Sequence, residues 1–409
     1  MKNFFSFVIK NPMILALLFI AIVFLPNAIS APPEGVQRQY VATIGLDLSP
    51  EGIELSILTH VSRNSATYNE TYIINSATAE SIPRALYKIA TVSGRQISLT
   101  HATSIVVSEQ IARQGLHNFL DYFYRNETIA NDTFVICAMN STAKDLLAFE
   151  KDRVNSTGYG LEELLAYNSQ NTFFVNSDVE NFYKGYFSPT KTSVVALATL
   201  EKNTDNEQVL QGGGSSGEGA SAAQNESKRI KSAGTLGLLK AGRLVDTMTE
   251  DDIFGYNLVN NQTHNIYLRI NNFSDELFEN ATVDFNIVTN KVAYISSFEN
   301  GRPVFTLNSL VSLALQSATA DEVKKEYFLN SVNPLSQKMK EAVVQKLRGS
   351  FSSFMQKIIA NKTDVFGVYT TLNNQHKKEF QAWLQNLQDP ENFLAYVEYR
   401  MNPNPILTT

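Results

Sequence analysis

The stretch LTHATSIVVSEQIARQG, from Leu99 to Gly115, decides how the first half of the chain folds. Residues 98–108 have the β-branched content of a strand, and the apolar residues after Ser108 recur at helical spacing. The stretch also holds four side chains that could carry chemistry, namely His101, Ser104, Ser108 and Glu109. It therefore encodes either an active site or a strand that turns into a helix.

The expected strand and helix favour the structural interpretation. Side chains alternate between the two faces of a strand, so His101 and Ser104 should point to opposite sides. A nucleophile needs its base within hydrogen-bonding distance, and this local arrangement does not supply one. Ser108 is a typical helix N-cap, and Glu109 in the first turn suits the helix dipole. We therefore expect a capped helix here, with His101 hydrogen-bonded and partly buried.

The surrounding sequence predicts a sheet flanked by helices. Strands are expected over 39–48 and 52–62, joined by a turn, and a helix over 81–94. The run TFVICAMN, 133–140, is typical of a strand, in which Cys137, the only cysteine, should be a small buried apolar residue. The resulting order of elements, β-β-α-β-α-β-α, favours a mixed sheet with right-handed crossovers.

A segment rich in glycine and serine divides the chain. DNEQVLQGGGSSGEGASAAQNESKR, 205–229, has low hydrophobicity and high chain entropy, so it cannot bury enough surface to fold. We expect an α+β protein with separate mixed α/β domains, built on mixed sheets with flanking helices and joined by this flexible linker. The expected units are a signal peptide or N-terminal anchor over 1–30, an N-terminal mixed α/β domain over 31–204, the linker over 205–232 and a C-terminal α+β domain over 233–409.

The second half should begin with a hairpin that turns at KAGR, Lys240–Arg243. Thr249 is expected to cap a helix with acidic residues in its first turn. An apolar stripe from Met339 to Ile358 predicts a long helix that packs on the core rather than a groove for a partner. The chain closes on alternating apolar residues from Phe393 to Met401, which are typical of a strand.

The N-terminal sequence indicates export. Lys2 and Lys10 give a positively charged start, and Met13–Leu25 is an uninterrupted apolar run of signal-peptide length. Cleavage is expected after Ser30, and the alternative is an uncleaved anchor that extends back to Phe4. In both cases we expect the rest of the chain outside the cytoplasm.

No residues are expected to form a catalytic, cofactor-binding or metal site. The five histidines include no pair at i, i+4 spacing, and the zinc-protease and phosphate-loop motifs do not occur. The nucleophile-elbow pattern G-x-S-x-G occurs only at 213–217, inside the glycine-rich linker and without the strand and helix that the motif needs. The net charge of -6, without a basic stripe, argues against nucleic acid as a partner. We therefore expect neither a cofactor nor an enzymatic activity.

Four blocks of the sequence resemble one family in the same order. They are IGLD (44–47), THATSIVVSEQIARQGLHNFLDYFYRNETI (100–129), GTLGLLKAGRLVDTMTEDDIFG (234–255) and KTDVFGVYTTL (362–372), the last followed by Trp383 and the closing strand. The family-like positions in the middle two blocks are His101, Glu109, Ala112, Gly115, Leu116, Leu120, Asp121, Arg125, Glu127, Leu244, Val245 and Gly255. The chain resembles the Ger(x)C family, the C component of bacterial spore germinant receptors.

The resemblance implies a non-catalytic, exported subunit that acts in spore germination or a related sensing process. Such a subunit would lie at the membrane surface, on the outer face of the bacterial cell or spore inner membrane, and contact polytopic membrane subunits of a germinant-receptor-like complex. The family carries a lipidated cysteine at its signal region; here that region has no cysteine, so lipidation is not expected. The alternative is an exported solute-binding or hydrolytic protein whose site forms only in three dimensions.

Overall fold

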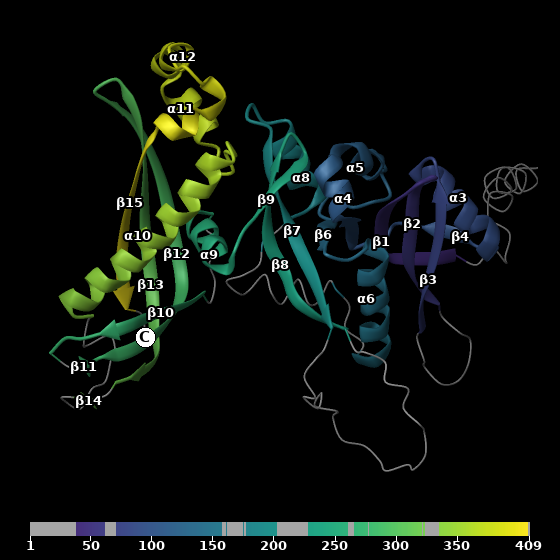
Figure 1. Cartoon of the computed structure of the whole chain (residues 1–409), viewed down its shortest axis with the longest axis horizontal. Helices are drawn as coiled ribbons and strands as arrows, with labels where there is room; N and C mark the ends of the chain where they lie inside the picture. Colours follow the sequence, from purple (N-terminus) through teal and green to yellow (C-terminus); the bar gives the residue numbers. More distant parts are fainter. Residues whose placement is uncertain are drawn as a thin grey trace, which may run out of the picture.

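The computed structural model describes residues 38–61, 71–157, 161, 175, 177–202, 228–260, 266–276, 278–320, 322–323 and 335–407. The expected signal segment, 1–30, and residues 205–227 of the expected linker lie outside these ranges. Of the helices within the described ranges, none is both long and apolar enough to cross a membrane. Two large sheets with flanking helices confirm the expected α+β class (Figure 1).

The first sheet has nine strands and is parallel at its centre. Its order is β3-β2-β1-β5-β6-β7-β8-β9, and β4 pairs with β1. Neighbours from β1 to β7 run parallel, whereas both margins are antiparallel. The strands are β1 Arg38–Ser49, β2 Gly52–Val61, β3 Thr71–Ala79, β4 Gln96–Ser98, β5 Ser104–Ser108, β6 Phe134–Met139, β7 Thr192–Lys202, β8 Lys228–Lys240 and β9 Arg243–Thr247.

Helices cover both faces of this sheet. The helices are α3 Ile82–Ser93, α4 Glu109–Gln114, α5 His117–Tyr124, α6 Ala143–Thr157 and α8 Val179–Tyr186. Strand β5 shows the division, because Ile105 and Val107 pack in the core under α3, α4, α5 and α8, whereas Val106 packs in the core under α6. A strand buried on both faces has a continuous apolar run, which explains the sequence SIVVS.

The IGLD block fixes helix α6 to strand β1. The buried carboxylate of Asp47 accepts hydrogen bonds from the backbone N–H groups of Ala143 at 2.8 Å and Lys144 at 3.0 Å, at the start of α6. Gly45 permits close approach of the helix, because a Cβ there would lie 3.2 Å from the Leu147 side chain. Burial raises the pKa of Asp47, and the two backbone N–H donors oppose that shift. The block is therefore structural.

The first sheet continues beyond the expected linker. Strand β8 pairs antiparallel with β7, so that Lys202 lies opposite Lys228, and β9 pairs with β8. Residues 228–232, expected to end the linker, instead begin a strand, and position 233 lies inside β8. The glycine-rich composition predicts a loop, but it does not determine which strands pair across that loop, because strand pairing is a long-range contact.

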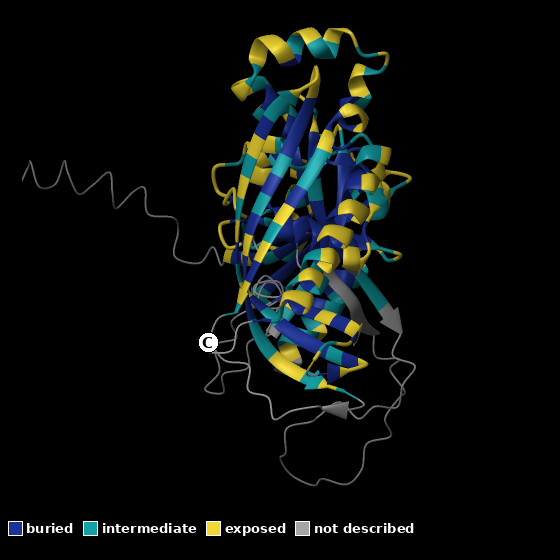
Figure 2. Cartoon of the chain, turned by 90° about the vertical axis from the view of Figure 1, so that its left-hand side faces the viewer, coloured by how far each residue is buried: buried dark blue, intermediate teal, exposed yellow. Residues whose placement is uncertain are grey.

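The second sheet has the order β10-β12-β13-β15 and carries α10 across one face (Figure 1). Buried and exposed residues alternate along much of β10, whereas β12 and β13 also contain runs of three consecutive buried residues (Figure 2). The predicted apolar stripe of α10 is buried as expected, at Met339, Val343, Leu347, Phe351, Phe354 and Ile358. The elements of this half are α9 Glu250–Val259, β10 Ile266–Phe273, β11 Phe278–Glu279, β12 Ala281–Glu299, β13 Arg302–Thr319, β14 Glu322–Val323, α10 Gln337–Ala360, α11 Val368–Gln375, α12 Lys377–Gln385, η1 Pro390–Tyr396 and β15 Glu398–Leu407.

The closing strand begins later than predicted. Its expected first residues form the 3-10 helix η1, and β15 then pairs parallel with β13. The Asp389 side chain accepts a hydrogen bond from the Asn392 backbone N–H at 3.3 Å, and Pro390 occupies the first turn. An aspartate followed by proline is a helix-start signal, and here it outweighs the alternating pattern that predicted a strand.

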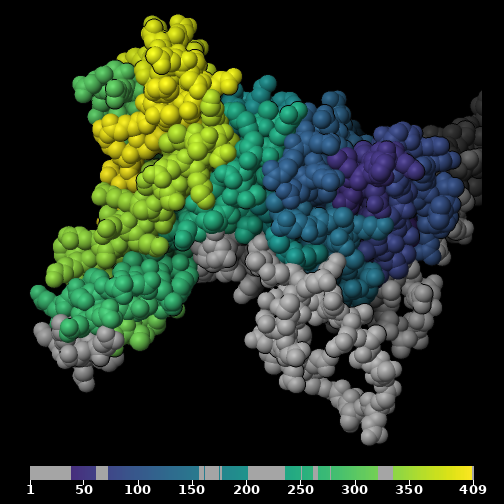
Figure 3. Space-filling model, in the orientation of Figure 1, coloured from purple at the N-terminus to yellow at the C-terminus, as the bar shows by residue number. Residues whose placement is uncertain are grey.

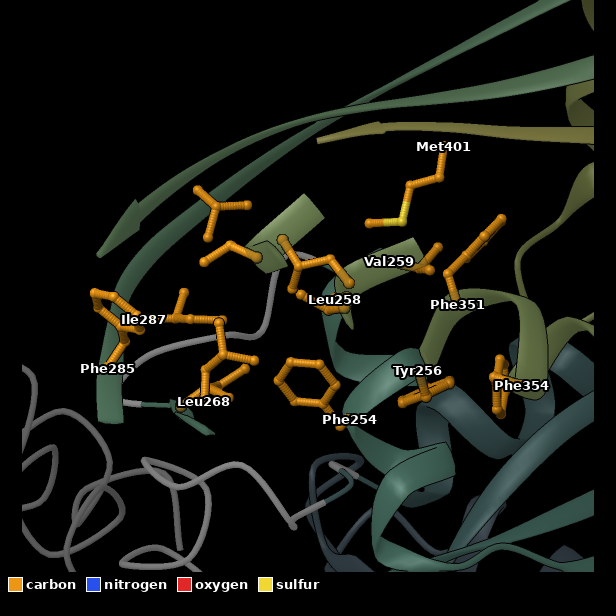
Figure 4. Close-up of a cluster of buried hydrophobic side chains, with 14 of the residues drawn as sticks. Phe254, Tyr256, Leu258, Val259, Leu268, Phe285, Ile287, Phe351, Phe354 and Met401 are labelled. Atoms are coloured by element: carbon orange, nitrogen blue, oxygen red, sulfur yellow. The ribbon is translucent and has the colours of Figure 1, made fainter. Parts of the chain in front are cut away.

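A continuous apolar core joins the two halves. We call the described residues of 38–247 the first lobe and those of 250–407 the second lobe. Leu236 and Leu238 of the first sheet belong to the same buried cluster as residues of the second sheet, α9 and α10. In Figure 4, Phe254 and Tyr256 of α9 lie among side chains from α10 and the second sheet. The two lobes therefore form one continuous body (Figure 3).

Candidate functional site

The KAGR segment forms the tight turn that the sequence predicted. Lys240 pairs with Arg243, and the two residues between them, Ala241 and Gly242, have φ of 49° and 75°. Positive φ at both central positions defines a type I′ turn, which matches the twist of the flanking strands. The Ala241 backbone N–H donates a 2.7 Å hydrogen bond to the carbonyl of Lys191, so the turn is tied to the start of β7.

The turn fits closely between helices of the first lobe. The Leu116 backbone N–H, between α4 and α5, donates to the Gly242 carbonyl at 2.8 Å. A Cβ at Gly242 would lie 3.1 Å from His117 Nδ1 and 3.3 Å from the Tyr186 ring. The rings of His117 and Tyr186 are stacked, with centroids 4.9 Å apart. Both the backbone conformation and the lack of space therefore require glycine at this position.

The same hairpin also reaches the second lobe. Lys240 Nζ donates to the carbonyl of Lys362 at 2.7 Å, and the Thr192 hydroxyl donates to the carbonyl of Asp364 at 2.8 Å. Burial lowers the pKa of Lys240, and the negative charges of Glu391 and Asp364 oppose that shift. Two first-lobe side chains thus bind backbone carbonyls in one short loop of the second lobe.

Asp364 organises that loop. Its side chain is 4% exposed, and its carboxylate accepts backbone N–H groups of Val368 and Tyr369, both at 2.8 Å, at the start of α11. Burial raises the pKa of Asp364 to about 6, although these N–H donors and the charge of Lys240 oppose the shift. Burial also raises the pKa of the Tyr399 hydroxyl, and the charge of Asp364 adds to the effect. The carboxylate is therefore a helix cap held in an apolar setting.

Two further polar contacts lie nearby, one between the lobes and one within the second lobe. Asn361 Nδ2 donates to Asp246 Oδ2 at 2.7 Å, between the lobes. The Lys357 ammonium pairs with Asp252, which also completes the capping box of α9 with Thr249, as the sequence predicted for that cap. Burial would raise the pKa of Asp252, but hydrogen bonds from Lys357 and Thr249 lower it. Helix α9 is therefore fixed to α10 by charge as well as by packing.

Gly255 sets the distance between α9 and α10. A Cβ at this position would lie 2.6 Å from the carbonyl oxygen of Ser350 and 2.8 Å from Phe354 Cβ. Backbone atoms cannot move aside as a flexible side chain can, so any larger residue would push the helices apart. The family-like glycine at 255 is thus explained by helix packing.

We call the junction of these contacts the joint, formed by Thr192, Lys240–Arg243, Asp246 and Asn361–Asp364. Three of the blocks quoted from the sequence meet here, because Leu116 belongs to the second block, the turn to the third and Asp364 to the fourth. The sequence identified the blocks but could not show that they contact one another in the fold. Thr192 and Asp364, for example, are 172 positions apart. The joint holds backbone groups in place and contains no nucleophile paired with a base.

The helix cap predicted at the opening stretch is confirmed. Ser108 accepts a hydrogen bond from the Ile111 backbone N–H at 3.4 Å, and Glu109 pairs with Arg113 at 2.7 Å along α4. Gly115 follows the end of α4 with φ of 130° and separates α4 from α5. These residues therefore have structural roles.

The expected strand around His101 is wrong in part. Residues 99–103 form a turn between β4 and β5, and His101 is exposed rather than partly buried. It is hydrogen-bonded to Thr100 Oγ1 at 2.9 Å and packs edge-on against Tyr40, with ring centroids 4.8 Å apart. Ser104 is buried and hydrogen-bonded to Thr43 at 2.9 Å. The two residues have different partners and form no catalytic pair.

Other candidate reactive groups are also engaged in the fold. Cys137 is buried, as predicted, and burial raises the pKa of its thiol to about 12, so the reactive thiolate is suppressed at neutral pH. Across the described ranges, no three His, Cys, Asp or Glu side chains are grouped so that they could hold a metal ion.

The fold and the joint define a two-lobed α+β protein built on mixed sheets. Comparison of the sequence with protein-family models identifies the family. A family model described as "Spore germination protein N-terminal domain" matches residues 36–200, and one described as "Spore germination B3/ GerAC like, C-terminal" matches 234–403. The chain belongs to the Ger(x)C family of spore germination proteins. The first match ends within β7 and the second begins within β8, so the first sheet includes strands from both matched regions.

A solved structure supports the fold. The structure titled "Crystal Structure of the GerBC protein" matches with a TM-score of 0.52 and 12% sequence identity, over 90% of this chain and 97% of that one. At this identity the match shows the fold alone. No curated protein matches the chain. Ger(x)C proteins are extracytoplasmic, membrane-associated receptor subunits without catalytic activity, and the chain is a member of that family.

Proposed function

We propose that the chain is a non-catalytic, exported subunit of a membrane-associated germinant-receptor-like complex. It acts in spore germination through protein–protein contacts with polytopic membrane subunits, on the outer face of the membrane that carries them. The observation that carries the proposal is the convergence of three family-like blocks on the joint. Of the polar groups described there, Lys240 binds a backbone carbonyl of the other lobe, and the Asp364 carboxylate caps α11 within its own lobe.

We infer that the joint makes the two lobes of this subunit move as one rigid piece. A force or contact applied to the second lobe reaches the first through the Lys362–Asp364 loop, the hairpin turn and the helices around Leu116. Because these contacts act together with the continuous apolar core, we infer that the lobes keep one relative orientation. We propose that the receptor uses the two lobes as a single rigid piece that bridges its membrane subunits.

Co-purification tests this proposal. An affinity-tagged chain is expressed together with two polytopic germinant-receptor-like membrane proteins of the same organism, each with its own epitope, and the membranes are solubilised in mild detergent. We expect both epitopes to be retained with the tagged chain. A tagged chain with a native circular dichroism spectrum that retains neither epitope would contradict the proposed assembly.

The non-catalytic part of the proposal has a separate test. His101→Ala and Glu109→Ala should leave assembly with the membrane subunits unchanged, because exposed His101 contacts only Thr100 and Tyr40 among the described contacts and Glu109 pairs with Arg113 of its own helix. A hydrolytic activity of the purified chain that either substitution abolishes, while the fold persists, would support the exported hydrolase instead.

A further inference from the structure

The outer edge of the first sheet is strand β3. It stands first in the strand order and, within the described ranges, pairs with β2 alone. In an antiparallel pair, alternate residues turn their N–H and C=O groups toward the neighbour and away from it. The Ile73 carbonyl faces β2, where it accepts from the Thr59 hydroxyl at 3.4 Å. The Tyr72 N–H faces outward, where it donates to Asn155 Oδ1 at 3.0 Å.

Two outward-facing positions of β3, Ile74 and Ser76, lie between positions that are covered, and we call these two positions the window. Tyr72 is covered by Asn155, and the carbonyl of Thr78 accepts from Lys88 Nζ at 2.7 Å. Between these two covered positions, Ile74 and Ser76 have the same outward parity. Exposed edges are commonly blunted by charged side chains or covering elements. Within the described ranges, such cover lies on both sides of the window and none lies over it.

Helix α3 overhangs this window and forms a groove with it. The groove has a volume of about 360 Å³ and is lined by Asn75, Ala77, Tyr87, Ile89 and Val92, among others. Tyr87 is 62% exposed and Val92 is 90% exposed, although both are large apolar side chains on one helix. The Asn75 Nδ2 atom is buried and has no hydrogen-bond partner within the described ranges. The groove thus offers apolar surface and a free donor beside an open strand edge.

The rim of the groove is positively charged. Arg84 and Lys88 project from α3, a helix whose sequence, IPRALYKIATVS, contains no acidic residue. Arg84 lies over the Tyr87 ring, 5.4 Å from its centroid, and is 4.0 Å from Glu80. Pairing of β3 with β3 of a second copy would bring two such rims together, and like charges repel. The charge therefore favours a partner segment that carries carboxylates.

We propose that β3 binds an extended, acidic segment of a partner protein as an added strand. Its backbone would pair with the outward groups of Ile74 and Ser76, and alternate apolar side chains would enter the groove under α3. A carboxylate of the same segment would meet Arg84 and Lys88, and one of its oxygens or a carbonyl would accept from Asn75 Nδ2. This inference concerns the chain alone and does not depend on the receptor assembly proposed above.

The test uses synthetic peptides and the purified exported chain. One fluorescent, acetylated seven-residue peptide alternates valine with glutamate, and its control alternates valine with lysine. We expect anisotropy to report binding of the glutamate peptide in preference to the lysine peptide. Hydrogen exchange should slow at the Ile74 and Ser76 amides when the glutamate peptide is present.

Two variants test separately the contribution of backbone pairing with β3 and that of the positive charge on the rim. Ser76→Pro removes an outward N–H and also the side-chain hydrogen bond to Ser56 of β2 at 2.8 Å, so it is compared with Ser76→Ala, which removes the side-chain bond alone. Relative to Ser76→Ala, affinity should fall about tenfold with the fold retained. Lys88→Glu should reverse the preference between the two peptides, which a damaged fold would not do. Equal binding of both peptides, or affinity that neither substitution alters, would overturn the proposal. Binding to anionic vesicles through Arg84 and Lys88, without peptide binding, would also overturn it and assign the face to a lipid surface.

Discussion

The hydroxyl of Thr192 donates a 2.8 Å hydrogen bond to the carbonyl oxygen of Asp364, 172 residues further along the chain. Thr192 begins strand β7 of the first sheet, and Asp364 precedes helix α11 of the second lobe. The contact is buried, with Thr192 and Asp364 each 4% exposed. One hydrogen bond therefore connects the two lobes at the same place where the hairpin turn meets them.

Thr192→Val should weaken the joint. The substitution keeps the shape of the side chain but leaves the buried Asp364 carbonyl without this donor, which should lower the free energy of unfolding by about 1–3 kcal/mol. Thr91→Val is the matched control, because the Thr91 hydroxyl also donates to a backbone carbonyl at 2.8 Å, but on the exposed face of α3. Urea titration should show a change within about 0.5 kcal/mol for the control. If both variants lost the same free energy of unfolding, the hydrogen bond at the joint would contribute no more to stability than the exposed one, which would contradict the account.

Gly242→Ala should destabilise the chain more than Gly301→Ala. Both glycines occupy two-residue hairpin turns, with φ of 75° and 73°, so both substitutions place a side chain in the left-handed region. A Cβ at Gly242 also meets His117 at 3.1 Å, whereas a Cβ at Gly301 meets nothing within 4 Å. We expect an excess loss of about 1 kcal/mol or more at Gly242, measured by urea titration. Identical losses would show that the fit beside His117 has no energetic effect.

Asp364→Asn should change how stability depends on pH. The pKa of Asp364 is about 6 in the fold against an ordinary 3.8, so the folded chain binds this proton more tightly than the unfolded chain. Ionisation therefore reduces stability as the pH rises from about 4 to about 6, by about 3 kcal/mol in total. The asparagine variant has no such proton, so its stability relative to the parent should increase across this interval. A constant difference between the two proteins over that interval would contradict the assignment.

Limited proteolysis tests the organisation around the expected linker. Residues 211–224 lie outside the described ranges, and their composition predicts the first cleavage there. Strands β7 and β8, on either side, pair along their length, so the two fragments should remain associated until denaturant is added. Size-exclusion chromatography under native conditions measures this directly. First cleavage elsewhere, or two fragments that separate without denaturant, would contradict the arrangement.

Sequence reasoning succeeded where the signal was local. The cap at Ser108, the turn at Lys240–Arg243 and the buried stripe of α10 each depend on residues within a few positions of one another. Backbone conformation and helical periodicity determine such features, so the sequence alone was sufficient to predict them. The turn at 99–103 was missed because the β-branched run that follows it suggested a longer strand.

The joint could not be predicted in the same way. Its residues come from β7, the β8–β9 hairpin and the loop before α11, and only the folded chain brings them together. The blocks that resemble the Ger(x)C family marked part of this set, but they gave no role to Asp364 or Lys240. The pairing of β8 with β7 was also missed, because the long segment between them suggested separate units rather than neighbouring strands.

Germination of spores that lack the gene tests the central claim most directly. The fall in absorbance after transfer to complex nutrient medium is measured for the deletion strain and for strains complemented with the parent chain or with the His101→Ala, Glu109→Ala double variant. We predict that the deletion loses a nutrient response and that both chains restore it, because the protein acts by assembly rather than by catalysis. A deletion strain that responds like its parent to every nutrient, or a folded double variant that restores nothing, would contradict this account.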